Sequence, residues 1–332
     1  MIMELTIISH ADVEEMLNFP ECVTVLEEAF LKARTGQCLT PPRTPLVLGP
    51  QKNFGAMAAY VEGMNTVGLK VNTVFSTNSG TRFHIHQGAI LVFETENGCL
   101  TGIVEAAAVT NIRTAAASAL ATKILTDNKP MSLAIIGAGT QGAQHIEAML
   151  AVRPITSLLI WDIAQERAEA MAERARLKTG LKAQAVATAA EAAEASDLIC
   201  VCTPAVNPVL SGEWVKPGTH INSVGFSGPG GRELDDGLLN KSKLYVDWRE
   251  TILRDCGDII LPLKSGVISE KDILGDFGDL TAASGPGRAP EDITLFKATG
   301  VAIEDLACAE FLLKKARREN RGAKTLFGGF ND

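Results

Sequence analysis

The order of apolar and polar positions divides the chain into a strand-rich first part and a second part with alternating strands and helices. Residues 5–36 read as a strand followed by one amphipathic helix from Asp12 through Leu31, where apolar residues recur at helical spacing. Pro41-Pro42 interrupts this periodicity, and Asn97-Gly98 further on predicts a hairpin turn. Between these signals lie short runs of β-type residues at 44–48, 54–60, 68–75 and 88–94.

The second part begins near residue 126 and repeats a strand–helix pattern. A helix is expected at 107–125 with Thr110 as its N-cap, and the segment 126–130 marks its end. Strands are then expected at 133–136, 157–161, 182–186, 198–203, 220–224 and 243–246, and helices at 141–150, 165–178 and 302–318. This alternation is typical of a doubly wound parallel sheet.

The predicted fold class is therefore α/β, a Rossmann-type doubly wound parallel sheet accompanied by a second, strand-rich α+β domain. We place the strand-rich domain at 1–125, with a C-terminal segment at about 313–332, and the Rossmann domain at 126–312. A chain of 332 residues has room for two domains. Its composition, 46% hydrophobic but only 5% aromatic, suits the branched aliphatic strands of a parallel sheet.

Charge and cysteine content exclude several classes of protein. The net charge of −8 provides no basic footprint, so we expect no nucleic-acid partner. We expect no membrane attachment either, because the N-terminus lacks the features of a signal peptide and no apolar run approaches the length of a membrane span. The seven cysteines are scattered without C-x-x-C spacing, which predicts reduced thiols, a cytoplasmic location and no metal site.

A glycine-rich motif follows the strand expected at 133–136. In the G-x-G-x-x-G pattern, Gly137 allows the tight turn, Gly139 lets the backbone approach a pyrophosphate, and Gly142 lets the next helix pack closely on the strand. Thr140 and Gln141 lie at the start of that helix, whose free N–H groups and partial positive charge favour phosphates. The context predicts a dinucleotide-binding βαβ unit.

The identity of the dinucleotide is indicated by Asp162, which ends the second strand of this unit. A carboxylate at that position accepts hydrogen bonds from ribose hydroxyls and repels a 2′-phosphate, and the next cation along the chain is Arg167. We therefore expect NAD as the cofactor, with NADH preferred over NADPH. Thr203 and Val224 follow later strands, whose carboxyl ends line the ligand cleft in such sheets, although ordinary turn chemistry is the alternative for either residue.

Three cations in the first part are candidates for binding a small anionic substrate, which a negatively charged protein must catch with a few placed groups. Arg43 follows two prolines, Lys70 lies within a β-type run, and Arg113 lies in the alanine-rich helix. Arginine pairs with carboxylates in a bidentate manner, and a desolvated lysine can take part in proton transfer. Spacing alone nevertheless favours solvated surface charges at all three positions.

The chain resembles the ornithine cyclodeaminase/mu-crystallin family through a set of short motifs spread from about residue 40 to residue 310. The matching pieces are Pro42-Arg43, Gly68-Leu-Lys70, His86-Gln87-Gly88, Arg113-Thr-Ala-Ala, Gly137-Ala-Gly139-Thr-Gln-Gly142, Asn222-Ser-Val-Gly225, Arg232-Glu-Leu-Asp235, Tyr245-Val-Asp247 and Phe296-Lys297. Each piece alone is common, but their combination and order are specific. The resemblance implies a homodimer built through the strand-rich domain, and an active site between the two domains.

The resemblance also implies that Arg43, Lys70 and Arg113 grip the carboxylate of a bound amino or imino acid. One departure concerns the loop after the strand at 220–224, where cyclodeaminases carry an Asp that contacts the reacting amines. Ser227 stands there in this chain and cannot hold an ammonium as a carboxylate can. The loop is similar to the mu-crystallin type, which reduces ketimines.

We therefore expect an NADH-dependent imine reductase that makes an L-amino acid, or the reverse oxidative deamination. In this interpretation Arg43 and Arg113 clamp the carboxylate, Lys70 helps to bind it and assists proton transfer, and Ser227 forms a hydrogen bond near the imine. Alternatives are an alanine dehydrogenase or cyclic ketimine reductase, an ornithine cyclodeaminase with retained NAD, and a non-catalytic cofactor-binding protein.

The exact imine is suggested by a second group of basic residues. Arg82, His84 and His86 share one face if the run is extended, and they would then supply cations for a second carboxylate. This pattern favours iminosuccinate, whose reduction gives aspartate. A loop with exposed polar residues is an equally good interpretation.

Overall fold

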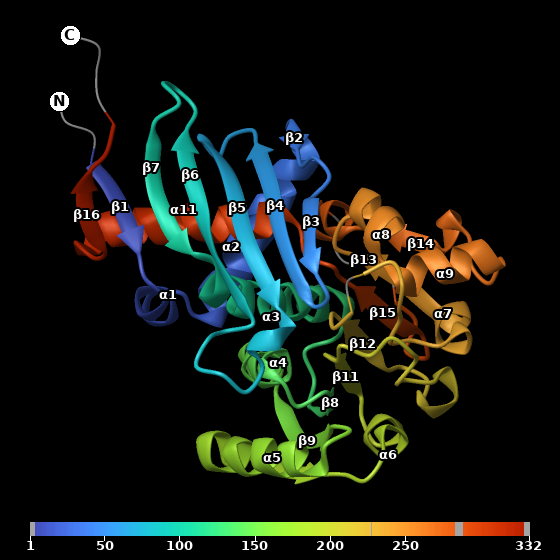
Figure 1. Cartoon of the computed structure of the whole chain (residues 1–332). Helices are drawn as coiled ribbons and strands as arrows, with labels where there is room; N and C mark the ends of the chain where they lie inside the picture. Colours follow the sequence, from blue (N-terminus) through green and yellow to red (C-terminus); the bar gives the residue numbers. More distant parts are fainter. Residues whose placement is uncertain (1–3, 227, 283–287, 329–332) are drawn as a thin grey trace. The chain divides into compact units, whose positions relative to one another are not determined.

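The computed structural model describes residues 4–226, 228–282 and 288–328, which form two compact units (Figure 1). The first unit comprises Met1–Arg113 and Val301–Asp332, and the second comprises Thr114–Gly300. These divisions differ from the boundaries expected at 125/126 and 312/313. Helix α3 (Ala106–Leu125) contributes to both units, and all of α11 (Ala302–Glu319) belongs to the first.

The first unit is built on a mixed, mainly antiparallel sheet, eight-stranded within the described residues. Its order is β16 (Ala323–Leu326), β1 (Glu4–Ile8), β7 (Leu100–Glu105), β6 (His86–Glu94), β5 (Thr66–Phe75), β4 (Lys52–Val61) and β2 (Cys38–Leu39), with β3 (Thr44–Gly49) also paired to β4. The hairpin predicted at Asn97-Gly98 joins the antiparallel strands β6 and β7, and Gly98 has the positive φ of 75° that the turn requires. The strand-rich character of this region is thus confirmed.

The helix predicted as one piece over residues 12–31 is two helices, α1 (His10–Met16) and α2 (Phe19–Thr35). The break occurs where Asn18 adopts an extended conformation and its side chain accepts a hydrogen bond from the Glu21 amide at 2.9 Å. Pro20 lies in the first turn of α2, where its missing N–H group costs nothing. The single-helix prediction was wrong because apolar periodicity continues across this cap.

Helices α2 and α11 lie behind the sheet of the first unit in Figure 1. Glycines admit α11 closely, because a Cβ on Gly68 would come within 2.5 Å of Leu306, and one on Gly102 within 2.3 Å of Leu313. The strand residues on this face are buried: Ala59, Val61, Thr66, Gly68, Lys70, Ile90, Val92, Gly102 and Val104. The opposite face carries apolar side chains that are at most half-buried.

The second unit contains a parallel sheet, eight-stranded in the part of the chain that the structure describes. Its order is β10 (Lys182–Ala185), β9 (Ile155–Trp161), β8 (Met131–Ile136), β11 (Leu198–Val201), β12 (His220–Ser223), β15 (Ile293–Lys297), β13 (Ser242–Val246) and β14 (Ile273–Gly275). From β8 the chain runs outward through β9 to β10 on one side and through β11 to β12 on the other, and β15 later inserts between β12 and β13. The doubly wound Rossmann-type sheet is thus confirmed. Strands β14 and β15 were not among those predicted.

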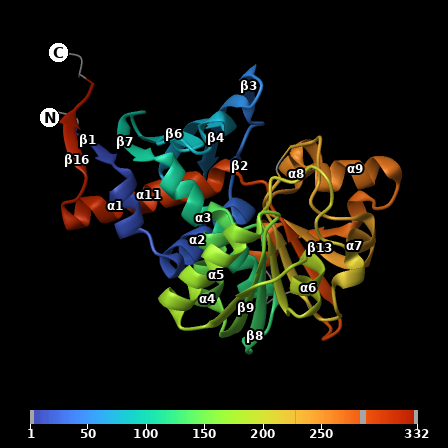
Figure 2. The ribbon, with the colours of Figure 1, turned by 60° about the horizontal axis from the view of Figure 1, so that its bottom comes forward.

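Helices cover both faces of this sheet: Figure 2 shows α4 and α5 on one side and α6 and α7 on the other. The helices of the unit besides α3 are α4 (Thr140–Val152), α5 (Gln165–Thr179), α6 (Ala189–Glu194), α7 (Asp236–Lys241), α8 (Arg249–Asp255), α9 (Gly257–Ser265) and α10 (Phe277–Ala282). The central strands β8 and β11 are almost wholly apolar and buried, as strands of two-sided sheets are, whereas β12 buries polar side chains and the edge strand β10 is partly exposed. Within the described residues, none of the helices combines the length and apolar character needed to cross a membrane.

The start of α3 differs from the sequence-based expectation. The helix begins at Ala106, and the Glu105 carboxylate accepts the backbone N–H groups of Ala107 at 2.9 Å and Ala108 at 2.8 Å. Thr110 lies inside the helix, where its hydroxyl donates to the Ala106 carbonyl at 2.7 Å. Thr110 is therefore not the N-cap, and this frees its oxygen to accept a hydrogen bond from elsewhere.

Candidate active site

Two of the predicted substrate-binding cations, Lys70 and Arg113, lie together in the first unit with two acids. The Asp305 Oδ1 atom accepts hydrogen bonds from Lys70 Nζ at 2.9 Å and from Arg113 Nε at 3.0 Å. Arg113 Nη1 also lies 2.8 Å from Glu304 Oε2. Because the four residues come from β5, α3 and the first turn of α11, we call Lys70, Arg113, Glu304 and Asp305 the β5–α11 cluster.

The β5–α11 cluster is almost completely buried. Lys70 and Arg113 are each 5% exposed, Asp305 is 1% exposed and Glu304 is fully buried. Solvated surface charges, which spacing alone favours, are therefore not what Lys70 and Arg113 are. Burial of these cations is tolerated because two carboxylates cancel their two positive charges.

Burial shifts the acid–base properties of the cluster. Desolvation lowers the pKa of Lys70 below its usual value, and the nearby Arg113 charge lowers it further, although Asp305 opposes both effects. Desolvation alone would raise the pKa of Asp305, but the charges of Arg113 and Lys70 lower it below the ordinary range. Lys70 consequently gives up its proton more readily than a surface lysine, while Asp305 stays a carboxylate.

Lys70 retains capacity to bind a further group. Its ammonium has three N–H donors, and among the described residues its hydrogen-bond partners are the Thr110 hydroxyl at 2.7 Å and Asp305. The remaining donor suits an anionic oxygen. The cluster thus combines a planar guanidinium with an ammonium of lowered pKa, a pair able to bind a carboxylate and to supply a proton.

The third predicted cation, Arg43, lies directly before β3 and is half-buried. His86 is the first residue of β6 and pairs in register with Val74 of β5. The surrounding protein desolvates its ring, and the charges of Lys70 and Arg113 add to this effect, so that its pKa falls to about 4 although the residue as a whole is exposed. Its imidazole is therefore neutral at neutral pH. The positive charges of Lys70 and Arg113 in the β5–α11 cluster disfavour its protonation.

Arg82 and His84 do not share a strand face with His86. Both lie in irregular backbone before β6, so the alternation argument that grouped the three residues was wrong. The His84 ring stacks on His10 with centroids 5.4 Å apart, and the Arg82 guanidinium lies 4.9 Å from the centre of the Phe83 ring. Local contacts hold these exposed side chains, as expected of a polar surface loop.

The glycine motif of the second unit forms a tight turn between β8 and α4. Gly137 has a φ of +107°, and a Cβ there would lie 2.7 Å from the Cys202 carbonyl oxygen. A Cβ on Gly142 would lie 2.1 Å from the Gly137 carbonyl oxygen, so this position must also lack a side chain. The two glycines bring strand and helix together as the sequence pattern predicts.

The start of α4 has the properties of a phosphate site. Gly139 is its N-cap and provides no side chain to satisfy the first-turn N–H groups of Thr140 and Gln141. A Cβ at Gly139 would touch one neighbouring atom, Arg167 Nη2, at 3.6 Å. This uncapped helix start, with a guanidinium beside it, fits the pyrophosphate of a dinucleotide.

Asp162 follows β9 and is buried against the glycine turn. Its Oδ2 atom accepts the Ala138 N–H at 2.7 Å, and its Oδ1 atom accepts the Ala164 N–H at 3.0 Å. Each carboxylate oxygen has a second lone pair, which leaves room for ribose hydroxyls. Asp162 therefore orders the turn and presents a negative charge beside it.

Thr203 and Val224 lie just after β11 and β12, at the carboxyl edge of the parallel sheet. The Val224 N–H donates to the Val201 carbonyl at 3.0 Å, and the Thr203 backbone and hydroxyl both donate to Glu233 at 2.7 Å. Ser227, the remaining predicted site residue, lies outside the described residues. The structure thus places the described candidates of the second unit along one edge of one sheet.

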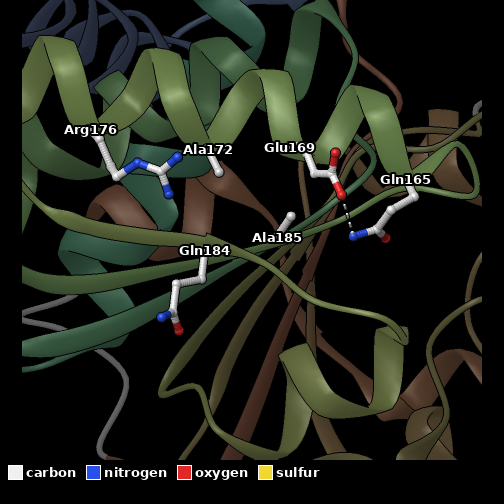
Figure 3. Close-up of a pocket in the computed structure, with 6 residues that line it drawn as sticks. All are labelled: Gln165, Glu169, Ala172, Arg176, Gln184 and Ala185. Atoms are coloured by element: carbon white, nitrogen blue, oxygen red, sulfur yellow. Dashed lines mark hydrogen bonds between the residues drawn. The ribbon is translucent and has the colours of Figure 1, made fainter.

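A separate surface groove lies between α5 and β10 (Figure 3). It is lined by Gln165, Glu169, Ala172, Arg176, Gln184 and Ala185, and Gln165 donates to Glu169 at 3.4 Å. Arg176 is engaged by Glu173 and by the Ala183 carbonyl. None of the predicted site residues lines this groove, so it adds nothing to the candidate site.

Sequence reasoning missed the acids of the β5–α11 cluster. Glu304 and Asp305 stand among Ala302, Ile303, Leu306 and Ala307, so two adjacent carboxylates interrupt an otherwise apolar stretch. Acids in an apolar stretch need cationic partners if they are buried, and Lys70 and Arg113 were already candidate cations of the site. The presence of two acids in an apolar helix and of two candidate cations elsewhere was the sequence signal that could have paired them.

Known proteins resemble the whole chain. The model of the ornithine cyclodeaminase/mu-crystallin family matches residues 3–320, and the chain belongs to this family. Ketimine reductase mu-crystallin of Mus musculus is 35% identical over 284 residues, covering 85% of this chain and 87% of the relative.

Two solved structures share the complete fold. Thermococcus litoralis Δ1-pyrroline-2-carboxylate reductase in complex with NADH and L-proline has a TM-score of 0.92 at 35% identity, covering 96% of this chain and 99% of that one. An archaeal alanine dehydrogenase dimer with bound NAD has a TM-score of 0.91 at 30% identity, covering 98% of this chain and 100% of that one. Both relatives carry a nicotinamide dinucleotide.

Proposed function

We propose that this member of the ornithine cyclodeaminase/mu-crystallin family reduces a small 2-imino acid to an L-amino acid with NADH, or catalyses the reverse oxidative deamination. The observation that carries the proposal is the buried β5–α11 cluster, where Arg113 and Lys70 lie against a shared carboxylate. A 2-imino acid offers a carboxylate for these cations and a C=N group next to it. The oxidoreductase names of the relatives support the same reaction class.

The roles of the side chains follow from their chemistry. Arg113 binds the substrate carboxylate, with Arg43 as a second guanidinium. Lys70 contributes the N–H donor not used by Thr110 and Asp305 and, because its pKa is lowered, assists proton transfer. Bound NADH supplies the hydride equivalent, and the protein supplies orientation and electrostatics. We assign Ser227 a hydrogen bond near the imine on the basis of the sequence.

We further propose that NADH is preferred over NADPH. Asp162 presents its carboxylate beside the glycine turn, where a 2′-phosphate would meet a like charge. The next two positions are Ile163 and Ala164, and the first cation that follows, Arg167, lies beside Gly139 at the start of α4, where we assign it to the pyrophosphate. The coarser cofactor class has independent support in the NADH and NAD bound by the two solved relatives.

Two imines are candidates within this class. The first is iminosuccinate, a dicarboxylic imine for which Arg82, His84 and His86 would supply extra positive charge. This argument is weaker because Arg82 and His84 do not share a strand face with His86. A cyclic ketimine such as Δ1-pyrroline-2-carboxylate is the second, favoured by the reductase of Thermococcus litoralis at 35% identity. Both present the same carboxylate and C=N group to the β5–α11 cluster.

Initial rates of NADH oxidation separate these possibilities. The panel comprises Δ1-pyrroline-2-carboxylate, and oxaloacetate, pyruvate and glyoxylate each mixed with ammonia, with NADPH in parallel. Turnover with oxaloacetate only when ammonia is present supports iminosuccinate, and turnover with pyruvate plus ammonia indicates an alanine dehydrogenase. Tight NADH binding without turnover on any imine would contradict the proposed reaction and favour a cofactor-binding protein.

We also propose a homodimer that uses the uncovered face of the sheet in the first unit. Val67, Leu69, Leu91 and Phe93 are at most half-buried there, and they pair directly across β5 and β6. An apolar sheet face of this kind requires a cover. A second copy is the occupant we favour, since the archaeal alanine dehydrogenase is a dimer.

Light scattering tests the dimer with Leu69→Lys, which places a charge in the middle of the proposed interface. The wild type is expected to have the mass of a dimer, and the variant the mass of a monomer. Leu177→Lys is the matched control, because Leu177 is also apolar and is 79% exposed on α5. A monomeric wild type, or a dimer unaffected by Leu69→Lys, would remove this interface.

A further inference from the structure

We infer that Glu233, Asp258 and Lys297 form a buried positioning network that holds the loops after β11 and β12 in one arrangement for NADH. We call these three residues the strand-end network. The inference rests on the proposed use of NADH and concerns residues that touch neither substrate nor cofactor in the proposal. It makes the network a determinant of cofactor affinity and of turnover.

Glu233 ties the two loops together through both of its carboxylate oxygens. Oε1 accepts the backbone N–H and the hydroxyl of Thr203, both at 2.7 Å. Oε2 accepts the N–H groups of Gly225 at 2.8 Å and Phe226 at 3.2 Å, and the Ser223 hydroxyl at 3.0 Å. Five donors from two separate strand ends therefore converge on one fully buried side chain.

The two loops also touch each other at a glycine. A Cβ on Gly225 would lie 2.1 Å from the Thr203 carbonyl oxygen and 2.4 Å from Glu233 Oε1. The close approach leaves no space for rearrangement around the carboxylate. Thr203 and Val224, the candidate cofactor residues, are consequently fixed relative to each other through Glu233.

Asp258 and Lys297 anchor Glu233 in turn. Asp258, in the first turn of α9, accepts the backbone N–H of Glu233 at 2.8 Å and that of Leu234 at 3.0 Å. Lys297, the last residue of β15, lies 2.8 Å from Asp258 Oδ2, 3.0 Å from the Ser223 hydroxyl and 3.5 Å from Glu233 Oε2. The network thus extends over β11, β12, β15 and α9.

Lys297 is fully buried and nevertheless keeps its charge. Desolvation alone would lower the pKa of Lys297, but the carboxylates of Asp258 and Glu233 raise it above the usual lysine value. Lys297 therefore remains a cation throughout the working pH range. Replacing Glu233 by the isosteric glutamine removes one charge and sets an NH₂ group against N–H donors, leaving buried donors without an acceptor.

Asp197 provides a matched control at the opposite edge of the same sheet. It precedes β11, accepts the N–H of Ser132 at 2.9 Å and its hydroxyl at 2.7 Å, and pairs with Lys216 at 2.8 Å. It is less buried than Glu233, but it uses the same combination of backbone, hydroxyl and lysine partners. Since the ligands of such sheets bind at the carboxyl edge, Asp197→Asn should affect stability alone.

The experiment measures NADH affinity by fluorescence titration, thermal stability, and kcat and KM for the imine found active, in the full-length protein. Glu233→Gln is expected to weaken NADH binding about tenfold and to lower kcat similarly at saturating NADH, with KM for the imine within about twofold. Asp197→Asn should lower the melting temperature while leaving all three constants within about twofold. Glu233→Asp keeps the charge and should fall between wild type and Glu233→Gln.

Ser223→Ala is the second variant if Glu233→Gln does not fold. It removes only the hydroxyl between Lys297 and Glu233, and NADH binding should weaken about threefold. Wild-type NADH affinity in Glu233→Gln or in Ser223→Ala, or an equal loss in Asp197→Asn, overturns the inference alone. Failure of the wild type to bind NADH overturns the proposed function, and the inference with it.

Discussion

The two units each bury a group of charged side chains, but the groups are built differently. In the β5–α11 cluster the charged side chains pair chiefly with one another, and Asp305 Oδ2 is buried without a hydrogen-bond partner among the described residues. In the strand-end network the carboxylates of Glu233 and Asp258 mainly accept backbone N–H groups. The lysines respond oppositely: the pKa of Lys70 is lowered, whereas that of Lys297 is raised.

The difference indicates that the two buried groups of charged side chains have different functions. Charged side chains that pair chiefly with one another can exchange partners when an anion arrives, and a lysine with a lowered pKa can release its proton. Carboxylates bonded to the backbone of two loops cannot move without disturbing the loops. We therefore assign the β5–α11 cluster to the substrate and the strand-end network to the geometry of the cofactor site.

The largest effect is expected from Arg113→Ala, which removes the proposed ligand of the substrate carboxylate and leaves Glu304 and Asp305 without their main cation. We expect kcat/KM for the imine to fall roughly 100- to 1,000-fold, with a clear loss of stability, because breaking a buried ion pair is costly. Arg113→Lys should be intermediate, since it keeps the charge but not the planar fork. Steady-state kinetics provide the measurement.

The matched control is Arg176→Ala, which removes an exposed arginine paired with Glu173 on α5. Exposed pairs contribute little, so its kcat/KM should remain within about twofold of the wild type. Comparable losses in both variants would mean that burial in the β5–α11 cluster has no special role in catalysis.

A smaller effect is expected in the pH dependence of kcat, which distinguishes Lys70 from Lys297. Because its pKa is lowered, Lys70 loses its proton below the pH at which an exposed lysine does, so kcat at saturating substrate should decline on the alkaline side as pH rises. Lys70→Arg keeps its proton at every accessible pH; the alkaline decline should vanish and the plateau should fall about tenfold. Lys297→Arg, tested in parallel, should retain the decline. Persistence of an unchanged decline in Lys70→Arg would exclude Lys70 as its source.

The smallest expected effect concerns Asp162, whose carboxylate holds the glycine turn as Glu233 holds the loops. Asp162→Asn removes the negative charge but keeps one oxygen acceptor. The preference for NADH over NADPH, measured as the ratio of kcat/KM values, should fall about fivefold while KM for the imine stays constant. An unaltered cofactor preference would show that the Asp162 charge does not select the cofactor.

Much of the fold could be predicted because local patterns decide it. Strands β8 to β13 of the parallel sheet, the glycine turn at Gly137 and Gly142, and the hairpin at Asn97-Gly98 all appear where the sequence indicates them, whereas β14 and β15 were not predicted. Polar caps were harder to predict. The break before Pro20 and the start of α3 depend on Asn18 and Glu105, whose side chains act on backbone groups two or three residues away.

The candidate site could be predicted only in part, because charge pairing joins distant segments. Lys70 was singled out, but its partner Asp305 lies 235 positions later in a helix divided between two expected domains. Glu233 and Lys297 were noted only as pieces of family motifs, and their meeting with Asp258 depends on the strand order of the sheet. Arg82 and His84 were grouped by an alternation that the irregular backbone before β6 does not follow.

The division of labour between the two charged groups is tested most directly by one equilibrium titration of NADH against the wild type, Arg113→Ala and Glu233→Gln. The account predicts that Arg113→Ala binds NADH within about twofold of the wild type, whereas Glu233→Gln binds it about tenfold more weakly. Equal affinities for the two variants, or a larger loss in Arg113→Ala, would contradict the assignment of one group to the substrate and the other to the cofactor.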